Sequence, residues 1–122
     1  MELPMAHLLS TLTSASLAIV FASLPAGAQA SRAAERGHAY ASAYCADCHV
    51  VEQGVPTPAN NTAPSFSAIA ATRGMTSMAI NAWFVSNHRN MPNFIIPERD
   101  REDLLAWFAV LREGHKQADN PH

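Results

Sequence analysis

Hydrophobic side chains recur at helical spacing along this chain, most clearly near its C-terminus. One helix face is formed by residues at i, i+3, i+4 and i+7, namely Leu104, Trp107, Phe108 and Leu111. Pro97 precedes the stretch, and acidic residues that oppose the positive end of the helix dipole fill its first turns: Glu98, Asp100, Glu102 and Asp103. The pattern predicts a helix that starts at Pro97 and ends in the stretch from Arg112 to Lys116.

Three shorter amphipathic stretches predict the remaining helices, over Ala33–Tyr44, Ser65–Thr72 and Thr76–Ser86. The segments Val51–Pro64 and Ser86–Pro97 contain several Pro and Asn residues and predict loops. No stretch alternates between apolar and polar residues as a strand would, so we expect an all-α domain.

Gly37 lies in the interior of the first expected helix. A glycine there costs about 1 kcal/mol of helix stability relative to alanine. A packing reason is therefore expected, and the close approach of another helix is the simplest one.

Residues 1–30 differ in composition from the rest. From Leu8 to Ala30 there is no charged residue, and the stretch closes in Ala28-Gln29-Ala30, an A-x-A cleavage pattern. We therefore expect a signal peptide over 1–30, cleaved after Ala30, and an exported domain over 31–122. Glu2, with no basic residue before the apolar stretch, departs from the usual signal pattern. The alternative, a membrane anchor, needs about twenty predominantly apolar residues, and here Ser, Thr and Pro25 interrupt the stretch.

Charge is nearly balanced. The whole chain has a formal net charge of −2, and loss of residues 1–30 removes one acid, Glu2, leaving eight basic residues against nine acidic ones. There is no basic stripe of the kind that binds nucleic acid, and Lys116 is the single lysine, so electrostatic steering of partners should be mild.

The two cysteines of the chain occur in Cys45-Ala46-Asp47-Cys48-His49. C-x-x-C-H is the attachment signature of c-type haem, in which each thiol adds to a vinyl group and the histidine becomes an axial ligand of the iron. A zinc site would need a second ligand pair, which the chain lacks. A redox-active dithiol is expected beside a βαβ pattern, whereas these flanks are helical. Haem attachment is the favoured chemistry, and export supports it, because an unmodified cysteine pair would tend to oxidise outside the cytoplasm.

Haem iron has a second axial position, for which the chain offers six candidates: Met75, Met78, Met91, His38, His88 and His115. Met91 is favoured because it lies in a loop and precedes Pro92, which restricts the backbone beside it. His88 is the main alternative, since imidazole binds iron well. Met78 is expected to fill the core, and His38, His115 and His122 to lie at the surface.

Residues 31–122 contain an ordered set of motifs. Through this set, nearly the whole of this stretch resembles the small bacterial class I cytochromes c. The set runs from Gly37, eight residues before Cys45, through Ala63-Pro64-Ser65-Phe66 and Met91-Pro92-Asn93-Phe94 to the final helix at Asp103–Phe108. The resemblance implies an all-α cytochrome c fold, with about three to five helices around one covalently attached haem c.

The resemblance also implies a role for individual residues. Cys45 and Cys48 would be the thioether positions, His49 the proximal iron ligand and Met91 the distal one. The carbonyl of Pro64 would accept a hydrogen bond from His49 Nδ1–H. Gly37 would let the first helix cross the last one near Trp107, and Trp83, Phe84 and Phe94 are candidates to line the haem pocket.

With both axial positions filled, such a site transfers single electrons between redox protein partners and is not an enzyme by itself. The protein would act in the periplasm, not spanning the membrane once processed, either as a free carrier or as the cytochrome subunit of a dehydrogenase. The alternative function is a haem-based ligand-binding or sensing protein with a labile distal site. The scarcity of lysine departs from the mitochondrial members of the family, so no partner is inferred from them.

Overall fold

A computed structural model describes residues 25–58, 60, 63–87 and 91–120 of the chain. It contains four helices in this part of the chain: α1 (Ala26–Tyr44), α2 (Phe66–Ala71), α3 (Ser77–Phe84) and α4 (Glu98–Asp119). No strand occurs among the described residues, so the all-α prediction is confirmed. Within the same residues, no helix is both long enough and apolar enough to cross a membrane.

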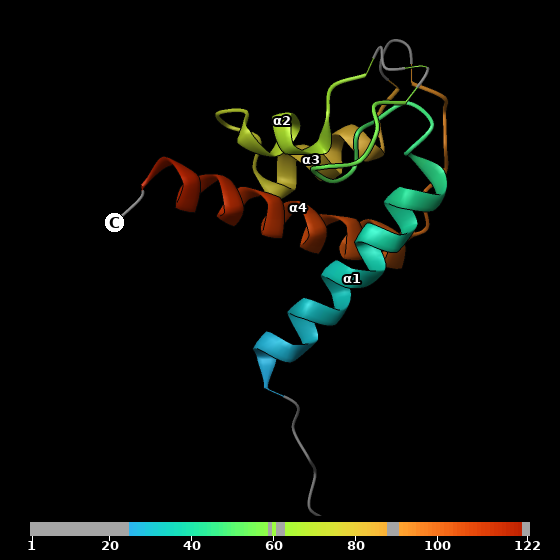
Figure 1. The fold of residues 1–122 in the computed structure, drawn as a ribbon. Coiled ribbons are helices and arrows are strands. Elements are labelled where there is room, and N and C mark those ends of the chain that lie inside the picture. The colour runs from blue at the N-terminus through green and yellow to red at the C-terminus, as the bar shows by residue number, and fades with distance from the viewer. Residues whose placement is uncertain (1–24, 59, 61–62, 88–90, 121–122) are drawn as a thin grey trace, which may run out of the picture.

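Helix α4 organises the fold, because each of the other three helices packs against it. In Figure 1, α1 crosses α4, and α2 and α3 lie together on one side of α4. The first turns of α1 project away from this body and are largely exposed. The predicted apolar face of α4 is turned inward, with Leu104 and Phe108 almost fully buried.

The crossing of α1 and α4 depends on Gly37, as predicted. A Cβ atom at this position would overlap the backbone carbonyl of Asp103 and lie 2.9 Å from the amide nitrogen of Leu104. The contact therefore falls at Asp103–Leu104, one turn earlier in α4 than the predicted contact near Trp107. Beside it, the guanidinium of Arg36 donates two hydrogen bonds to the buried Asp103 carboxylate, at 2.6 and 2.7 Å. This bidentate pairing raises the pKa of Arg36.

Two short helices begin at the residues that the sequence indicated. The hydroxyl of Ser65 accepts a hydrogen bond from the amide of Ala68, and that of Thr76 accepts one from Ala79, so both residues are N-caps. Arg112 of α4 fixes the junction before α3, since it donates to the Met75 carbonyl and to the Ser77 hydroxyl, each at 2.9 Å.

Three predicted helix boundaries were wrong. Helix α1 begins at Ala26, before the expected cleavage position, because small helix-forming residues extend it back to Pro25. Helix α3 ends at Phe84 rather than Ser86. Helix α4 continues past Lys116 to Asp119, since Gly114 adopts helical backbone geometry there instead of ending the helix.

Met78 was expected in the core and is 82% exposed. Ile80 and Phe84 of α3, which lie four residues apart, pack into the core, whereas Met78 is on the opposite side of this short helix. The spacing of apolar residues in an eight-residue helix did not distinguish these two faces.

Candidate functional site

The Cys45–His49 motif forms a tight turn directly after α1. Cys45 is the C-cap of α1, and its carbonyl accepts hydrogen bonds from the amides of Cys48 at 3.2 Å and His49 at 2.9 Å. Both cysteines are partly buried, and no disulfide joins them. The helix end therefore presents two thiols and the following imidazole within one turn, as attachment to a single cofactor requires.

The environment of Cys45 opposes the chemistry of a redox-active dithiol. Burial raises its pKa to about 11, and the neighbouring Cys48 adds to the effect. A nucleophilic cysteine of a disulfide oxidoreductase instead has a lowered pKa, because the thiolate is the reactive form. The raised pKa therefore argues against a redox-active dithiol at this motif.

His49 is held with one ring nitrogen available. Its Nδ1 lies 2.7 Å from the carbonyl oxygen of Pro64, and because a carbonyl can only accept, Nδ1 carries the proton. The lone pair is therefore on Nε2, the nitrogen free to bind a metal. The ring packs edge-on against Phe66, with centroids 5.3 Å apart, which further limits its rotation.

The four residues from His49 to Glu52 are here called the 49–52 segment. Each of them contacts a residue elsewhere in the fold. His49 donates to the Pro64 carbonyl, the Val50 carbonyl accepts from the amide of Phe66, and the Val51 carbonyl accepts from the indole of Trp107 at 3.2 Å. Glu52 pairs with His38 of α1 at 3.0 Å. The chain that carries His49 is thus fixed to α1, α2 and α4.

The Trp107 tie can be tested by substitution. Trp107→Phe keeps an aromatic ring but removes the indole N–H, which leaves the Val51 carbonyl without this donor. We expect a loss of about 1 kcal/mol in the free energy of unfolding, measured by urea denaturation. Unchanged stability would show that the Val51 carbonyl gains an equivalent partner.

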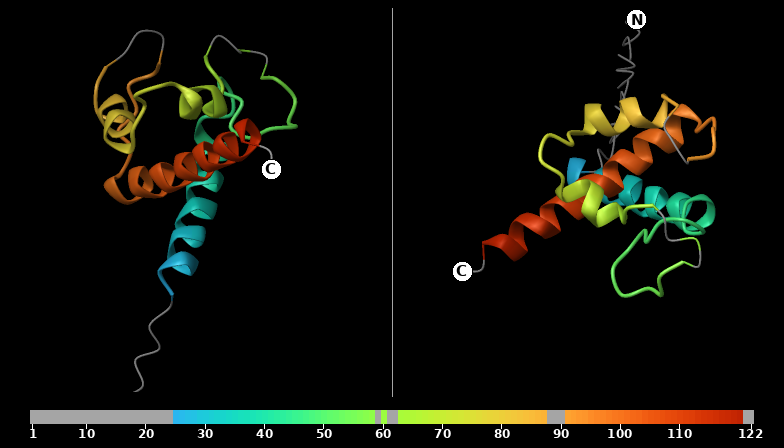
Figure 2. Two further views of the ribbon diagram at one scale, coloured as in Figure 1. Left: turned by 90° about the vertical axis from the view of Figure 1, so that its left-hand side faces the viewer. Right: turned by 90° about the horizontal axis from the view of Figure 1, so that it is seen from above.

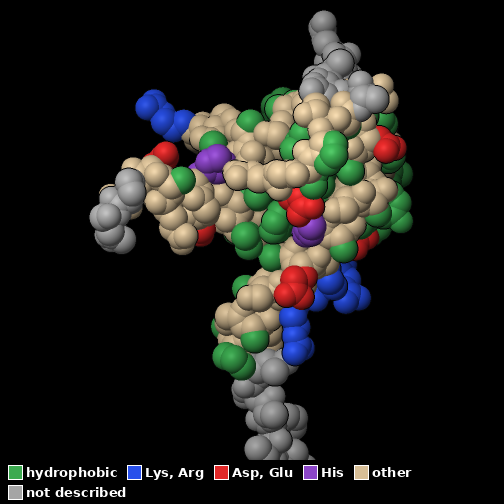
Figure 3. Space-filling model, in the orientation of Figure 1, with side chains coloured by type: hydrophobic (Ala, Val, Ile, Leu, Met, Phe, Trp, Pro, Cys, Tyr) green, Lys and Arg blue, Asp and Glu red, His purple; other side chains and the backbone are tan. Residues whose placement is uncertain are grey.

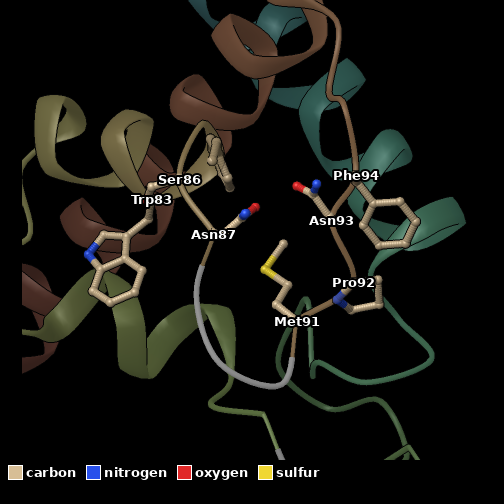
Figure 4. A pocket seen from close by; sticks show the side chains of 8 residues that line it. Trp83, Ser86, Asn87, Met91, Pro92, Asn93 and Phe94 are labelled. Carbon is tan, nitrogen blue, oxygen red and sulfur yellow. The ribbon is translucent and has the colours of Figure 1, made fainter.

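Met91 shares a small cavity with the three aromatic residues proposed as haem-pocket lining. The cavity has a volume of about 20 Å³ and lies between α3 and the loop that leads to α4. Its lining residues are Trp83, Phe84, Ser86, Asn87, Met91, Pro92, Asn93 and Phe94. Figure 4 shows the Met91 side chain pointing into this loop, between Asn87 and Asn93. The structure therefore brings together Met91, Trp83, Phe84 and Phe94, which the sequence proposed from separate segments.

The loop that follows the Cys45–His49 motif and the loop that carries Met91 lie on the same side of α4. Figure 2 shows them projecting in the same direction on either side of α2. Trp83 and Phe94 are each 49% exposed, so the apolar surface between α3 and the Met91 loop is not fully covered by protein. Apolar side chains that a haem would bury are thus available beside the candidate sulfur ligand.

The other candidate ligands are less well placed. Met75 packs against the core and Met78 is exposed on α3. His38 was expected at the surface and is instead half-buried, stacked on Trp107 with ring centroids 4.6 Å apart. His115 is also partly buried, so the surface prediction was wrong for both residues. His88 and His122 lie outside the described residues.

The surface carries no concentrated field of one sign on the face shown in Figure 3, where acidic and basic side chains are interspersed. Among the described residues, no three His, Cys, Asp or Glu side chains gather into a metal-binding group.

Comparison with known proteins identifies a relative of this chain. Cytochrome c-552 of Bradyrhizobium diazoefficiens is 32% identical to this chain over 82 residues, which cover 66% of this chain and 78% of that protein. No protein-family model and no solved structure matches the chain.

Proposed function

Since this chain belongs to the c-type cytochromes and carries covalent haem c, we propose that it is a periplasmic monohaem electron carrier whose iron is bound by His49 and Met91. Cys45 and Cys48 would hold the haem through thioether bonds. The haem supplies a site that gains and loses one electron, and the protein sets its potential through the ligands, burial and hydrogen bonds.

The hydrogen bond from His49 to Pro64 carries this proposal. It places the proton on Nδ1, so Nε2 is available to the iron without a further change of tautomer. A backbone acceptor also makes the imidazole a better donor to the metal. The residues present therefore fit a c-type haem on the side of the motif.

Support for Met91 is separate. Its thioether points between Asn87 and Asn93 into a small cavity that Trp83, Phe84 and Phe94 also line, and Pro92 restricts the backbone next to it. Methionine as the second axial ligand raises the reduction potential relative to a second histidine. A filled second position also suits electron transfer rather than binding of a small ligand.

Covalent attachment is tested by expressing the chain with haem-attachment machinery and denaturing the product. We expect haem to stay with the polypeptide in the wild type and to be lost when both Cys45 and Cys48 are replaced by alanine. If wild-type haem separates on denaturation, the proposal is wrong.

N-terminal sequencing of the exported protein tests the expected start at Ser31. Co-purification of this cytochrome with a dehydrogenase would identify the cytochrome as a dedicated subunit.

Substitution of Met91 tests the distal ligand. Met91→Ala should abolish the sulfur-to-iron(III) charge-transfer band, lower the midpoint potential and allow the reduced protein to bind carbon monoxide rapidly, because the sixth position opens. His88→Ala is the matched control, three residues earlier in the same loop, and should retain the wild-type spectrum. The opposite result for the two variants would assign the ligand to His88. Rapid carbon monoxide binding by the wild type would favour the ligand-sensing alternative.

A further inference from the structure

The 49–52 segment is held by four contacts of unequal kind. Three of them end at backbone carbonyls, those of Pro64, Val50 and Val51. The fourth joins two ionisable side chains, His38 Nε2 and Glu52 Oε2, at 3.0 Å. The strength of this fourth contact therefore depends on pH, whereas the carbonyl contacts involve no change of charge on the acceptor.

His38 is well placed to act on the segment. It extends from α1, close to the Gly37 crossing, and its ring rests on the Trp107 ring with centroids 4.6 Å apart. The same Trp107 donates to Val51, the residue next to Glu52. His38 thus contacts the segment directly through Glu52 and indirectly through Trp107.

The charged and polar groups around His38 determine how its protonation would be stabilised. Glu52 is the acidic group that faces it from the loop, and Trp107 is the neutral ring packed on it from α4. On α1 itself, the Ser42 hydroxyl lies 3.5 Å from Nε2. The nearby Arg36–Asp103 pair at the helix crossing is mutually neutralised. Protonated His38 therefore gains a charge-assisted hydrogen bond to Glu52 without a facing positive charge in these contacts.

We propose that His38 is a positioning residue for the proximal haem ligand, which acts through Glu52 and the 49–52 segment on the orientation of His49 and makes the reduction potential depend on pH. This inference rests on the proposed function. Histidine is the side chain that changes charge between about pH 5 and 8. When His38 is protonated, the contact joins an imidazolium to the Glu52 carboxylate and the segment is held more firmly; when His38 is neutral, the contact is a weaker hydrogen bond or is lost.

The test measures two properties of the haem-loaded protein between about pH 5 and 8. The first is the midpoint potential, which should fall as the pH rises, because loss of a positive charge stabilises iron(III). The second is the pattern of haem methyl resonances in the oxidised protein, which follows the orientation of the axial imidazole. His38→Gln keeps a donor to Glu52 but does not titrate, so we expect both properties to become nearly independent of pH over this range. His38→Ala removes the tie and should show the high-pH resonance pattern throughout.

His115→Gln is the control, because His115 is another partly buried histidine and lies on α4. This variant should retain the wild-type pH profile. A His38→Gln variant that keeps the wild-type profile overturns the proposal. So does a wild-type potential that changes with pH while the resonance pattern does not, because that would be an effect of charge alone. Every variant is first checked for covalent haem and a reversible one-electron couple. If the couple is present and does not respond to His38, this inference alone fails; absence of covalent haem overturns the proposed function as well.

Discussion

Phe108→Ala is expected to lower the free energy of unfolding by about 3–5 kcal/mol, the usual cost of truncating a buried phenylalanine. Phe108 is 1% exposed, and its ring stacks on Phe66 with centroids 4.7 Å apart and contacts Phe84 at 6.1 Å. Small domains have a total stability of about 5–15 kcal/mol, so the loss is a large part of the whole. Urea denaturation of the haem-loaded protein measures it.

The same substitution should affect the site, because Phe66 lies between Phe108 and the imidazole of His49. Phe108→Leu leaves a smaller gap and should cost clearly less. Val110→Ala is the control on the same helix; Val110 is 48% exposed, and the expected change is within about 0.5 kcal/mol. Equal losses for Phe108→Ala and Val110→Ala would show that the aromatic stack is not the centre of the core.

Gly37→Ala is expected to destabilise the protein by about 2–3 kcal/mol, although alanine is the better helix former. The added Cβ would overlap the Asp103 carbonyl, a backbone atom that no side-chain rotation can move. The two helices must therefore separate, which would weaken the packing of Ala41 and Leu104, both fully buried. Thermal or urea denaturation tests this prediction.

Gly114→Ala is the matched control for helix propensity. Gly114 lies in α4 with no neighbouring atom within 4 Å of an added Cβ, so its replacement should stabilise the protein by up to about 1 kcal/mol. If Gly37→Ala stabilises the protein as Gly114→Ala does, the close crossing of α1 and α4 is not required by the fold.

Local sequence patterns were sufficient to predict those helix boundaries that are fixed by interactions between residues close together in the sequence. The starts of two helices at Ser65 and Thr76 were identified from residue type and position, since the capping that fixes them involves atoms only three residues apart. The ends of α1 and α4 were missed because Ala, Gln and Lys permit helix beyond the last tertiary contact, and propensity alone sets no sharp boundary.

Burial was harder to predict than secondary structure. Met78 and His38 were assigned to the wrong environments, one to the core and the other to the surface. Which face of a helix is covered depends on where neighbouring helices lie, and α3 is too short for its own periodicity to decide this. His38 is covered because Gly37 lets α4 approach α1 closely.

By itself the sequence determined the haem-attachment chemistry, because two thiols and the imidazole are adjacent in Cys45–His49 and need only a local turn to meet. It also determined the all-α class, through helical periodicity. The family resemblance implied that Pro64 accepts from His49 Nδ1–H, and the tertiary structure brings this acceptor, fifteen residues away, to 2.7 Å. Only the tertiary structure decided that His38 reaches Glu52. These contacts join distant segments, and the packing of α1 against α4 sets their distances.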